Sequence, residues 1–342
     1  MKQHLGATRV LLLALSLPAA AGCWRADDRA VIVYSALDQE FAEPILQDFE
    51  RTTGIRVLAK YDVESTKTVG LVNAIMQERQ RPRCDVFWNN EILHTLRLQK
   101  EGLLEPYRSP AAGDFPDAYR SPDGAWCGLA ARLRVLIVNT QVVAANERPH
   151  SIHDLVDEKW KGRVGIAKPL FGTTATHAAV LFAVWGEERA QQFFRRLQQN
   201  AQVLSGNPHV AAAVGRGELA FGLTDTDDAI AEKDSGAPVE LIYPDQGETE
   251  AGAVFIPNTV AAIKGAAHHA AAQQLIDYLL SPPVETRLAQ GRSAQFPLNR
   301  RVTVKSRAQG AREIRVCAVD FAAAAERWDA AARFLRDEVS GR

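Results

Sequence analysis

The apolar residues in the first third of the chain follow two alternating patterns. A β-branched run at 31–34 and segments rich in apolar residues at 55–58 and 85–88 predict short strands. Segments whose apolar residues recur every three or four positions predict helices after these strands, and they lie at 41–49, 66–80 and 91–100. A regular alternation of strand and helix with short connections is typical of a doubly wound α/β lobe.

A second α/β region begins at residue 135. Its predicted strands lie at 135–138, 163–167, 219–223, 239–242, 254–256 and 260–263. Its predicted helices lie at 173–185, 187–199, 267–280, 283–290 and 318–336. The sequence contains no internal repeat, and no flexible linker separates the two regions. We therefore predict two lobes joined by strands, with a ligand site between them.

The first residues have the pattern of an export signal. Residues 1–22 contain Lys2 and Arg9 but no acid, and a short apolar run follows Arg9. The stretch ends in Ala-Ala-Gly-Cys at Cys23, which resembles a bacterial lipobox. We therefore expect a signal peptide over 1–22 and a lipid on Cys23, which would anchor the protein in the periplasm or cell envelope. The alternatives are an ordinary secretory signal with an incidental cysteine and, less favoured because of its length, an uncleaved anchor.

Composition and charge exclude several classes of function. The 342 residues are 46% hydrophobic and 24% charged, which is ordinary for a globular protein. Lys plus Arg number 40 against 41 Asp plus Glu, and removal of 1–22 leaves 38 against 41, a net charge of −3. Because no basic excess is available to bind phosphates, we expect no nucleic-acid partner. No stretch after the signal has the roughly 20 apolar residues that a membrane span requires.

The remaining cysteines leave two possibilities open. Lipid on Cys23 would leave Cys84, Cys127 and Cys317, an odd number. Cys84 and Cys127 each lie beside a predicted strand, so they could form one disulfide. All three could equally be buried thiols.

No catalytic signature is present in the sequence. The chain lacks G-x-S-x-G, H-E-x-x-H, a Walker loop and a G-x-G-x-x-G that follows a strand. An exported hydrolase on the same scaffold remains a minor alternative, and it would need a nucleophile or a bound metal with an open position. We therefore predict a binding protein rather than an enzyme, used for transport or for sensing.

Polar side chains gather where the predicted strands end. Three aspartates follow the strand at 219–223, and threonines open the helix at 173–185, where free backbone N–H groups favour an anion. Arg132 and Arg134 alternate with Leu133 and so share one face of their strand. Strand ends of both lobes meet at one cleft in such folds. The candidate ligand-binding residues are Ser35, Asp38, Asn90, Glu91, Arg132, Thr173, Thr174, Asn207, Asp225, Asp227 and Asp228.

Six segments, taken in order, resemble a known family. They are Val33-Tyr34-Ser35-Ala36, Asp85-Val86-Phe87-Trp88-Asn89-Asn90-Glu91, Ala131-Arg132-Leu133-Arg134-Val135, Trp160-Lys161-Gly162-Arg163-Val164, Ile256-Pro257-Asn258-Thr259-Val260 and Ser293-Ala294-Gln295-Phe296-Pro297-Leu298. Their order and spacing resemble the periplasmic substrate-binding proteins of ABC importers, specifically the ferric-ion-binding type of family 1 extracellular solute-binding proteins.

The resemblance implies an α/β, type II periplasmic-binding-protein fold with two lobes. Each lobe would be a doubly wound sheet with flanking helices, and hinge strands would cross between the lobes. We expect one lobe from 30–133 plus about 258–300, and the other from 134–257 plus about 301–342. The resemblance also implies a monomer, no enzymatic activity, and an ABC permease and ATPase as partners.

The resemblance implies a metal ligand but not the usual donor set. Relatives hold iron with adjacent tyrosines that match Asp227 and Asp228 here, while other ligands match Asp38 and either Asn90 or Glu91. An arginine that holds an anion in some relatives matches Arg132. The implied metal residues are Asp38, Glu91, Asp227 and Asp228.

Two ligand classes therefore remain open. Carboxylates in place of phenolates suit hard cations in general. They would equally hold an organic ammonium. We expect a metal ion, of the iron(III) type, with a small organic cation or a zwitterion such as an aminophosphonate as the alternative, and no other cofactor.

Overall fold

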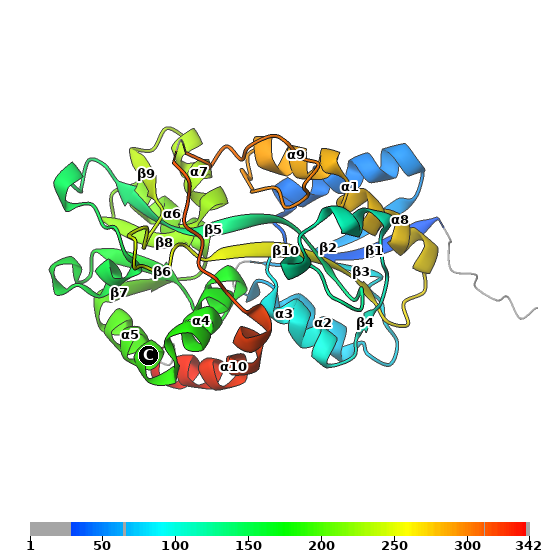
Figure 1. Ribbon diagram of the computed structural model, residues 1–342, viewed down its shortest axis with the longest axis horizontal. Coiled ribbons are helices and arrows are strands. Elements are labelled where there is room, and N and C mark those ends of the chain that lie inside the picture. The colour runs from blue at the N-terminus through cyan, green and yellow to red at the C-terminus, as the bar shows by residue number, and fades with distance from the viewer. Residues whose placement is uncertain (1–28, 64–65, 311, 340–342) are drawn as a thin grey trace, which may run out of the picture.

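The computed structural model describes residues 29–63, 66–310 and 312–339. The predicted signal peptide and Cys23 lie outside the described residues. One half of the molecule is built on β1 (Ala30–Ser35), β2 (Arg56–Tyr61) and β3 (Val86–Asn89). These strands are parallel, with β1 between β2 and β3. Figure 1 shows this half on the right.

The other half is built on β6 (Val164–Ala167), β7 (Ala201–Leu204) and β8 (Phe221–Asp225). Here β6 is parallel to both β7 and β8. The short strands β4 (Leu104–Glu105) and β9 (Val239–Ile242) pair at the sides of β10 and β5. Both halves thus carry strands whose carboxyl ends can face a shared cleft.

Two long antiparallel strands, β5 (Cys127–Asn139) and β10 (Phe255–Ile263), join the halves. The sheet order is β2-β1-β3-β10-β5-β8-β6-β7, so β10 and β5 stand between the two parallel sets (Figure 1). Up to Leu133, β5 pairs with β10, and from Arg134 onward it pairs with β8 and β9. Every residue of β5 is buried, which explains why most of its residues are apolar. Arg132 and Arg134 are the exceptions, because they are charged and still buried.

Helices cover the faces of both sheets. The half on the right of Figure 1 contains α1 (Gln39–Thr53), α2 (Val69–Gln77), α3 (Leu93–Lys100), α8 (His269–Leu279) and α9 (Pro282–Gln290). The other half contains α4 (Gly172–Trp185), α5 (Glu187–Asn200), α6 (Asn207–Gly215) and α7 (Thr226–Asp234). In α1 the predicted apolar face is buried, and Gly54 ends the helix in a left-handed conformation.

The C-terminal helix α10 (Phe321–Phe334) packs against both α3 and α4. Its Trp328 lies 5.9 Å from the ring of His94, measured between centroids, and both side chains are buried. Leu93 of α3 belongs to the same hydrophobic cluster as α4 and the strand β6. The core of one half is therefore continuous with a helix of the other.

Some sequence predictions need correction. The predicted strands 254–256 and 260–263 are largely one strand, because a register shift at Pro257 and Asn258 lets β10 continue past the proline. The predicted helices at 66–80 and 91–100 begin later, at Val69 and Leu93.

The predicted alternative of a disulfide between Cys84 and Cys127 does not hold in the structure. Cys84, Cys127 and Cys317 are all free and buried. Within the described part of the chain, no helix is both long and apolar enough to cross a membrane.

Candidate functional site

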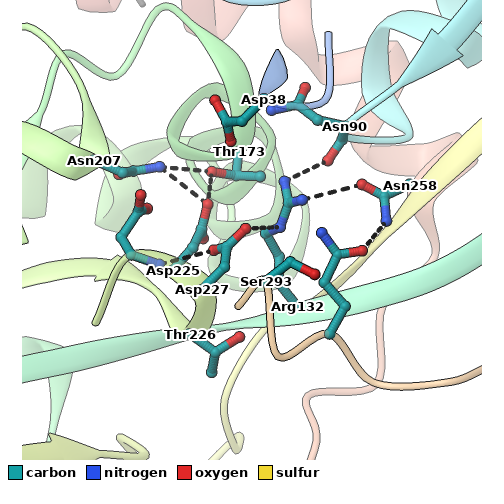
Figure 2. Close-up of polar contacts among 12 residues, drawn as sticks. Asp38, Asn90, Arg132, Thr173, Asn207, Asp225, Thr226, Asp227, Asn258 and Ser293 are labelled. Atoms are coloured by element: carbon teal, nitrogen blue, oxygen red, sulfur yellow. Dashed lines mark hydrogen bonds and ion pairs between the residues drawn. The ribbon is translucent and has the colours of Figure 1, made fainter. Parts of the chain in front are cut away.

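A small polar pocket lies between the two halves, where the ends of several strands and helices meet (Figure 2). Its volume is about 20 Å³, which is room for about one water molecule. The pocket is lined by Asp38, Lys67, Asn90, Arg132, Ala167, Lys168, Phe171, Gly172, Thr173, Thr174, Ser205, Gly206, Asn207, Pro208, Asp225, Asp227 and Asp228. All but two of the residues proposed from the sequence belong to this lining.

The two that do not are Ser35 and Glu91, and both lie behind the pocket wall. Ser35 is fully buried and donates its hydroxyl to the carbonyl of Leu37 at 3.2 Å. Glu91 is fully buried as well, and its carboxylate accepts hydrogen bonds from within the protein. Their positions at the ends of β1 and β3 led to the prediction that they lie at the site, but their side chains point into the core.

The donors around Glu91 keep its carboxylate ionised. Asn89 Nδ2 lies 2.9 Å from Oε1, His94 Nδ1 lies 3.1 Å from Oε1, and Thr176 Oγ1 lies 2.6 Å from Oε2. Burial alone would raise the pKa of Glu91, but the charge and hydrogen bond of His94 and the bonds from Thr176 and Asn89 hold it below its ordinary value. These partners give Glu91 a role inside the protein.

Arg134 organises the side of the pocket formed by β8. Its Nη1 lies 2.7 Å from Asp225 Oδ1 and 3.2 Å from Thr173 Oγ1. Asp225 Oδ2 accepts from Thr173 Oγ1 at 2.5 Å and from Asn207 Nδ2 at 3.0 Å, and Arg134 Nη2 donates to Thr174 Oγ1 at 3.3 Å. Each oxygen of Asp225 therefore has a partner within the network.

Arg132 occupies the centre of the site (Figure 2). Its Nε lies 3.0 Å from Asp227 Oδ2, and its two terminal nitrogens donate to the Asn90 carbonyl and to Asn258 Oδ1, each at 3.1 Å. Asn258 donates in turn to Gln295 Oε1 at 2.8 Å. Arg132 thus connects β5 with α7 through Asp227, with the segment after β3 through Asn90, and with β10 through Asn258.

The carboxyl of Asp227 is buried beside other acids. Burial raises the pKa of Asp227 to about 6, with further increases from Asp225 and Asp38, while Arg132 and Lys67 lower it. Asp228 lies next to it and accepts from the Thr224 hydroxyl at 3.2 Å. One carboxylate oxygen from each of Asp225, Asp227 and Asp228 lies within 4.8 Å of the others.

Lys67 completes the pocket on the side of β1. Its ammonium forms an ion pair with Asp38, and its carbonyl accepts the Gly172 N–H at 3.2 Å. The next residue, Thr68, has φ 68° and ψ −51°. The Val69 N–H donates to the Lys67 carbonyl at 2.8 Å across it, which is a strained γ-turn. Hydrogen bonding of the Thr68 hydroxyl to Asn90 Oδ1 at 2.6 Å holds this conformation.

Helix α4 points its first turn at the pocket through Gly172, Thr173 and Thr174. The first N–H groups of an α-helix have no partner within the helix, and they carry partial positive charge. Lys67 and Lys168 also line the pocket, and the Lys67 carbonyl accepts the Gly172 N–H of this turn. The arrangement suits a bound anionic group.

Several lining residues were missed by the sequence analysis. The sequence predicts Lys67 near the start of a helix over 66–80, whereas the structure places it in the strained turn before α2. Lys168 and Phe171 follow β6, and a strand-end position could have indicated them. Asn258 is not part of this lining but accepts a hydrogen bond from Arg132, and the sequence contained it only within the segment 256–260 that resembles the family.

The charges of the site are balanced. Asp38, Asp225 and Asp227 are each paired with a cation, namely Lys67, Arg134 and Arg132. Among the described residues, no tyrosine lines the pocket. The site can therefore hold a group of either sign, but it lacks the phenolates and the strong excess of negative charge that favour a bare ferric ion.

Comparison with known proteins agrees with this architecture. A model of the family described as bacterial extracellular solute-binding protein matches residues 94–323. The Fe(3+)-binding periplasmic protein of Serratia marcescens is 26% identical over 215 residues, which cover 63% of this chain and 62% of that protein, less than two thirds of its length. A periplasmic protein of Salmonella typhi named for 2-aminoethylphosphonate binding is 26% identical over 293 residues, covering 83% and 82%.

Solved structures have the same fold. Apo ferric ion-binding protein A of Pasteurella haemolytica superposes with a TM-score of 0.80 at 21% identity, covering 91% of this chain and 98% of that one. The periplasmic binding protein AfuA of Actinobacillus pleuropneumoniae, with fructose-6-phosphate bound, gives 0.80 at 23% identity and the same coverage. The predicted α/β periplasmic-binding-protein fold is confirmed.

Proposed function

Because this chain belongs to the bacterial extracellular solute-binding protein family, we propose that it captures a small zwitterionic solute between its halves and delivers it to an ABC importer. The family consists of solute-binding proteins and not of enzymes. The observation that carries the choice of ligand is the charge balance of the pocket. Its carboxylates and its cationic groups are interleaved, so a ligand with one charge of each sign meets a complementary partner for both.

A bare metal ion would have to compete with cations that the protein already supplies. Arg134 and Arg132 lie 2.7 and 3.0 Å from the nearest oxygens of Asp225 and Asp227. A cation bound to these carboxylates would stand close to buried guanidinium groups, and repulsion at such distances is strong where water is excluded. An organic ammonium meets less of this repulsion, because its charge is single and it binds through hydrogen bonds.

The two ends of the pocket suit the two ends of a zwitterion. We place the ammonium at Asp227 and Asp228, and the anionic group at the first turn of α4 beside Lys67. An aminophosphonate has this pair of groups, and one relative in Salmonella typhi is named for such a ligand. A pocket of 20 Å³ is too small for a molecule of this size. We take the two halves to be the lobes predicted from the sequence. They must therefore separate to admit the ligand, and they would close around it to leave a larger pocket than the one described above.

A metal ion is the second candidate, and two observations favour it. Oxygens of Asp225, Asp227 and Asp228 lie within 4.8 Å of one another, and the pocket volume matches a small ion better than an organic molecule. Carboxylate oxygens are the ligands of hard cations. A relative in Serratia marcescens is named for Fe(3+) binding.

We further propose that a lipid on Cys23 holds the protein at the membrane surface, where it meets the permease. The basis is the small-residue sequence Ala-Ala-Gly before Cys23. Mass spectrometry of the protein purified from membranes would detect the acylated cysteine. An unmodified N-terminus, or cleavage at another residue, would contradict this part of the proposal.

A thermal-shift assay on the purified protein separates the two ligand classes. A ligand that binds only the folded state adds about 2.7 kcal/mol at a concentration one hundred times its Kd. We expect 2-aminoethylphosphonate to raise the Tm, and ferric citrate, Mn²⁺ and Ca²⁺ to leave it unchanged. A shift with a metal ion and none with the aminophosphonate would overturn the zwitterion proposal in favour of the second candidate.

The matched variants are Asp227→Asn and Asp234→Asn. Both residues belong to α7, but Asp227 lines the pocket whereas Asp234 pairs with Arg307 at the surface. We expect Asp227→Asn to abolish the ligand-induced shift, measured from each variant's own Tm, and Asp234→Asn to retain it. An undiminished shift in Asp227→Asn would move the ligand to another part of the molecule.

A further inference from the structure

Helix α4 is held at two points by the opposite half of the molecule. Its first residue, Gly172, donates its N–H to the Lys67 carbonyl at 3.2 Å. One turn later, Thr176 Oγ1 donates to Glu91 Oε2 at 2.6 Å. Lys67 and Glu91 come from the half that contains β1 and β3, whereas α4 packs in the core of the half that contains β6 and β8. These two bonds therefore join the halves outside the crossing strands β5 and β10.

The bond between Thr176 and Glu91 is the stronger of the two by its chemistry. Both side chains are fully buried, and the acceptor is an ionised carboxylate. A hydroxyl that donates to a carboxylate at this distance forms a charge-assisted hydrogen bond, which is about twice as strong as a neutral one. Of the side chains bonded to Glu91, Asn89 and His94 belong to its own half, and Thr176 belongs to the other.

The same bond sets the distance across the pocket. Asn90, the neighbour of Glu91, lines the pocket on one side. Thr173 lies three residues before Thr176 on the same face of α4 and lines it on the other. When Thr176 meets Glu91, Asn90 and Thr173 are brought to opposite walls of one site. Glu91 and Thr176 themselves do not line the pocket.

We propose that Glu91 and Thr176 form a latch that biases the protein toward its closed arrangement, whichever solute it binds. The latch positions Asn90 and Thr173 without touching the ligand. When the halves separate, water replaces the threonine hydroxyl at the carboxylate, so opening loses only the net value of the bond. A hydrogen bond to a charged group has a net value that corresponds to roughly a tenfold change in an equilibrium constant.

The test measures the opening of the ligand-free protein, so it does not depend on the identity of the ligand. Small-angle X-ray scattering reports the radius of gyration, and hydrogen exchange reports protection at the first turn of α4. We expect Thr176→Val, which replaces the hydroxyl with a methyl group, to lower the closed-to-open ratio roughly tenfold. The radius of gyration should rise, and exchange in the first turn of α4 should accelerate. Thr176→Ser keeps the hydroxyl and should restore the wild-type values.

The matched control is Thr140→Val. Thr140 donates its hydroxyl to the Pro238 carbonyl at 3.0 Å within one half, so its loss should leave the radius of gyration unchanged. Thr176→Ala removes the same hydroxyl without placing a methyl group beside the carboxylate, and it serves if the valine variant does not fold. Wild-type scattering and wild-type exchange in a folded variant without the hydroxyl would overturn the latch. Failure of the zwitterion proposal in the thermal-shift assay would leave the latch intact.

Discussion

At the scale of single residues, the site is governed by buried charges that compensate one another. Arg132 and Arg134 are almost fully buried on a strand with no exposed residue. Each would be very costly without its acid, because an isolated charge in the core loses its hydration. Asp227 and Asp225 supply this compensation. Asp227, one of the metal residues that the resemblance implies, therefore also compensates the charge of Arg132 in the structure.

Asp227 should make the stability of the protein depend on pH. Burial raises its pKa to about 6, above the value of 3.8 expected in the unfolded chain. The folded state then binds more protons between these pH values, so the contribution of Asp227 to stability is greatest below pH 4 and falls as the pH rises toward 6. Relative to Asp227→Asn, the wild type should lose roughly 2–3 kcal/mol of unfolding free energy between pH 4 and pH 6.5.

Urea unfolding of both proteins at these two pH values measures the effect. Asp234→Asn, at the exposed end of the same helix, is the surface control. A difference between wild type and Asp227→Asn that stays constant with pH would contradict the raised pKa.

At the scale of elements, α4 links the ligand pocket to the inter-half contacts. Its first turn faces the pocket, and its second turn reaches Glu91. The helix begins at Gly172, whose φ of 53° lies in the left-handed region. Only glycine adopts this conformation without cost, so the sequence Phe-Gly-Thr-Thr at 171–174 suits a sharp entry into the helix.

Gly172→Ala should therefore destabilise the protein by about 1 kcal/mol, through the cost of a Cβ in the left-handed region. The added Cβ would lie 3.4 Å from Lys67 Cγ, which is an ordinary contact, so crowding adds little. Gly54→Ala, at φ 70° with nothing near its Cβ, is the matched control and should lose a similar amount. Chemical denaturation compares the two. A loss of unfolding free energy several times larger at Gly172 than at Gly54 would mean that the turn at Lys67 cannot move to accommodate the added Cβ.

At the scale of the whole molecule, α10 is a brace as well as a covering helix. It contacts α3 in one half and α4 in the other. Its Trp328 is buried against His94 of α3 and belongs to the core that includes α4. Relative movement of the halves must therefore involve α10 together with β5 and β10.

Trp328→Ala should cost roughly 3–5 kcal/mol of stability, as large-to-small changes of buried tryptophans do. It should also increase the radius of gyration, because it loosens a contact between the halves. Trp160→Ala removes an equally buried tryptophan that packs on Phe221 within one half, so it should lose similar stability without this increase. Thermal unfolding and small-angle scattering of both variants check the expectation. An equal radius of gyration in the two folded variants would exclude α10 as a brace.

The sequence by itself determined most of the elements, though not β4, β7, α6 or α7, and nine of the 17 residues that line the pocket. Periodicity located the α/β alternation, and strand ends indicated Asp38 and Asp227, because side chains at these ends can lie near a shared cleft. The start of a helix indicated Thr173, and the alternation with Leu133 indicated Arg132. Short-range patterns suffice for such features, since the hydrophobic period and the end of a strand are local properties.

Only the tertiary structure decided how those residues are used. Glu91 is a core carboxylate bonded to α4 rather than a pocket residue, because Thr176, far away in sequence, is folded against it. Lys67 reaches the site through a strained turn that helical periodicity concealed. The pairing of Asp38, Asp225 and Asp227 with cations depends on contacts between segments 29 to 95 residues apart. A linear pattern of charges does not specify such distances, and the proposal of a zwitterionic ligand rests on them.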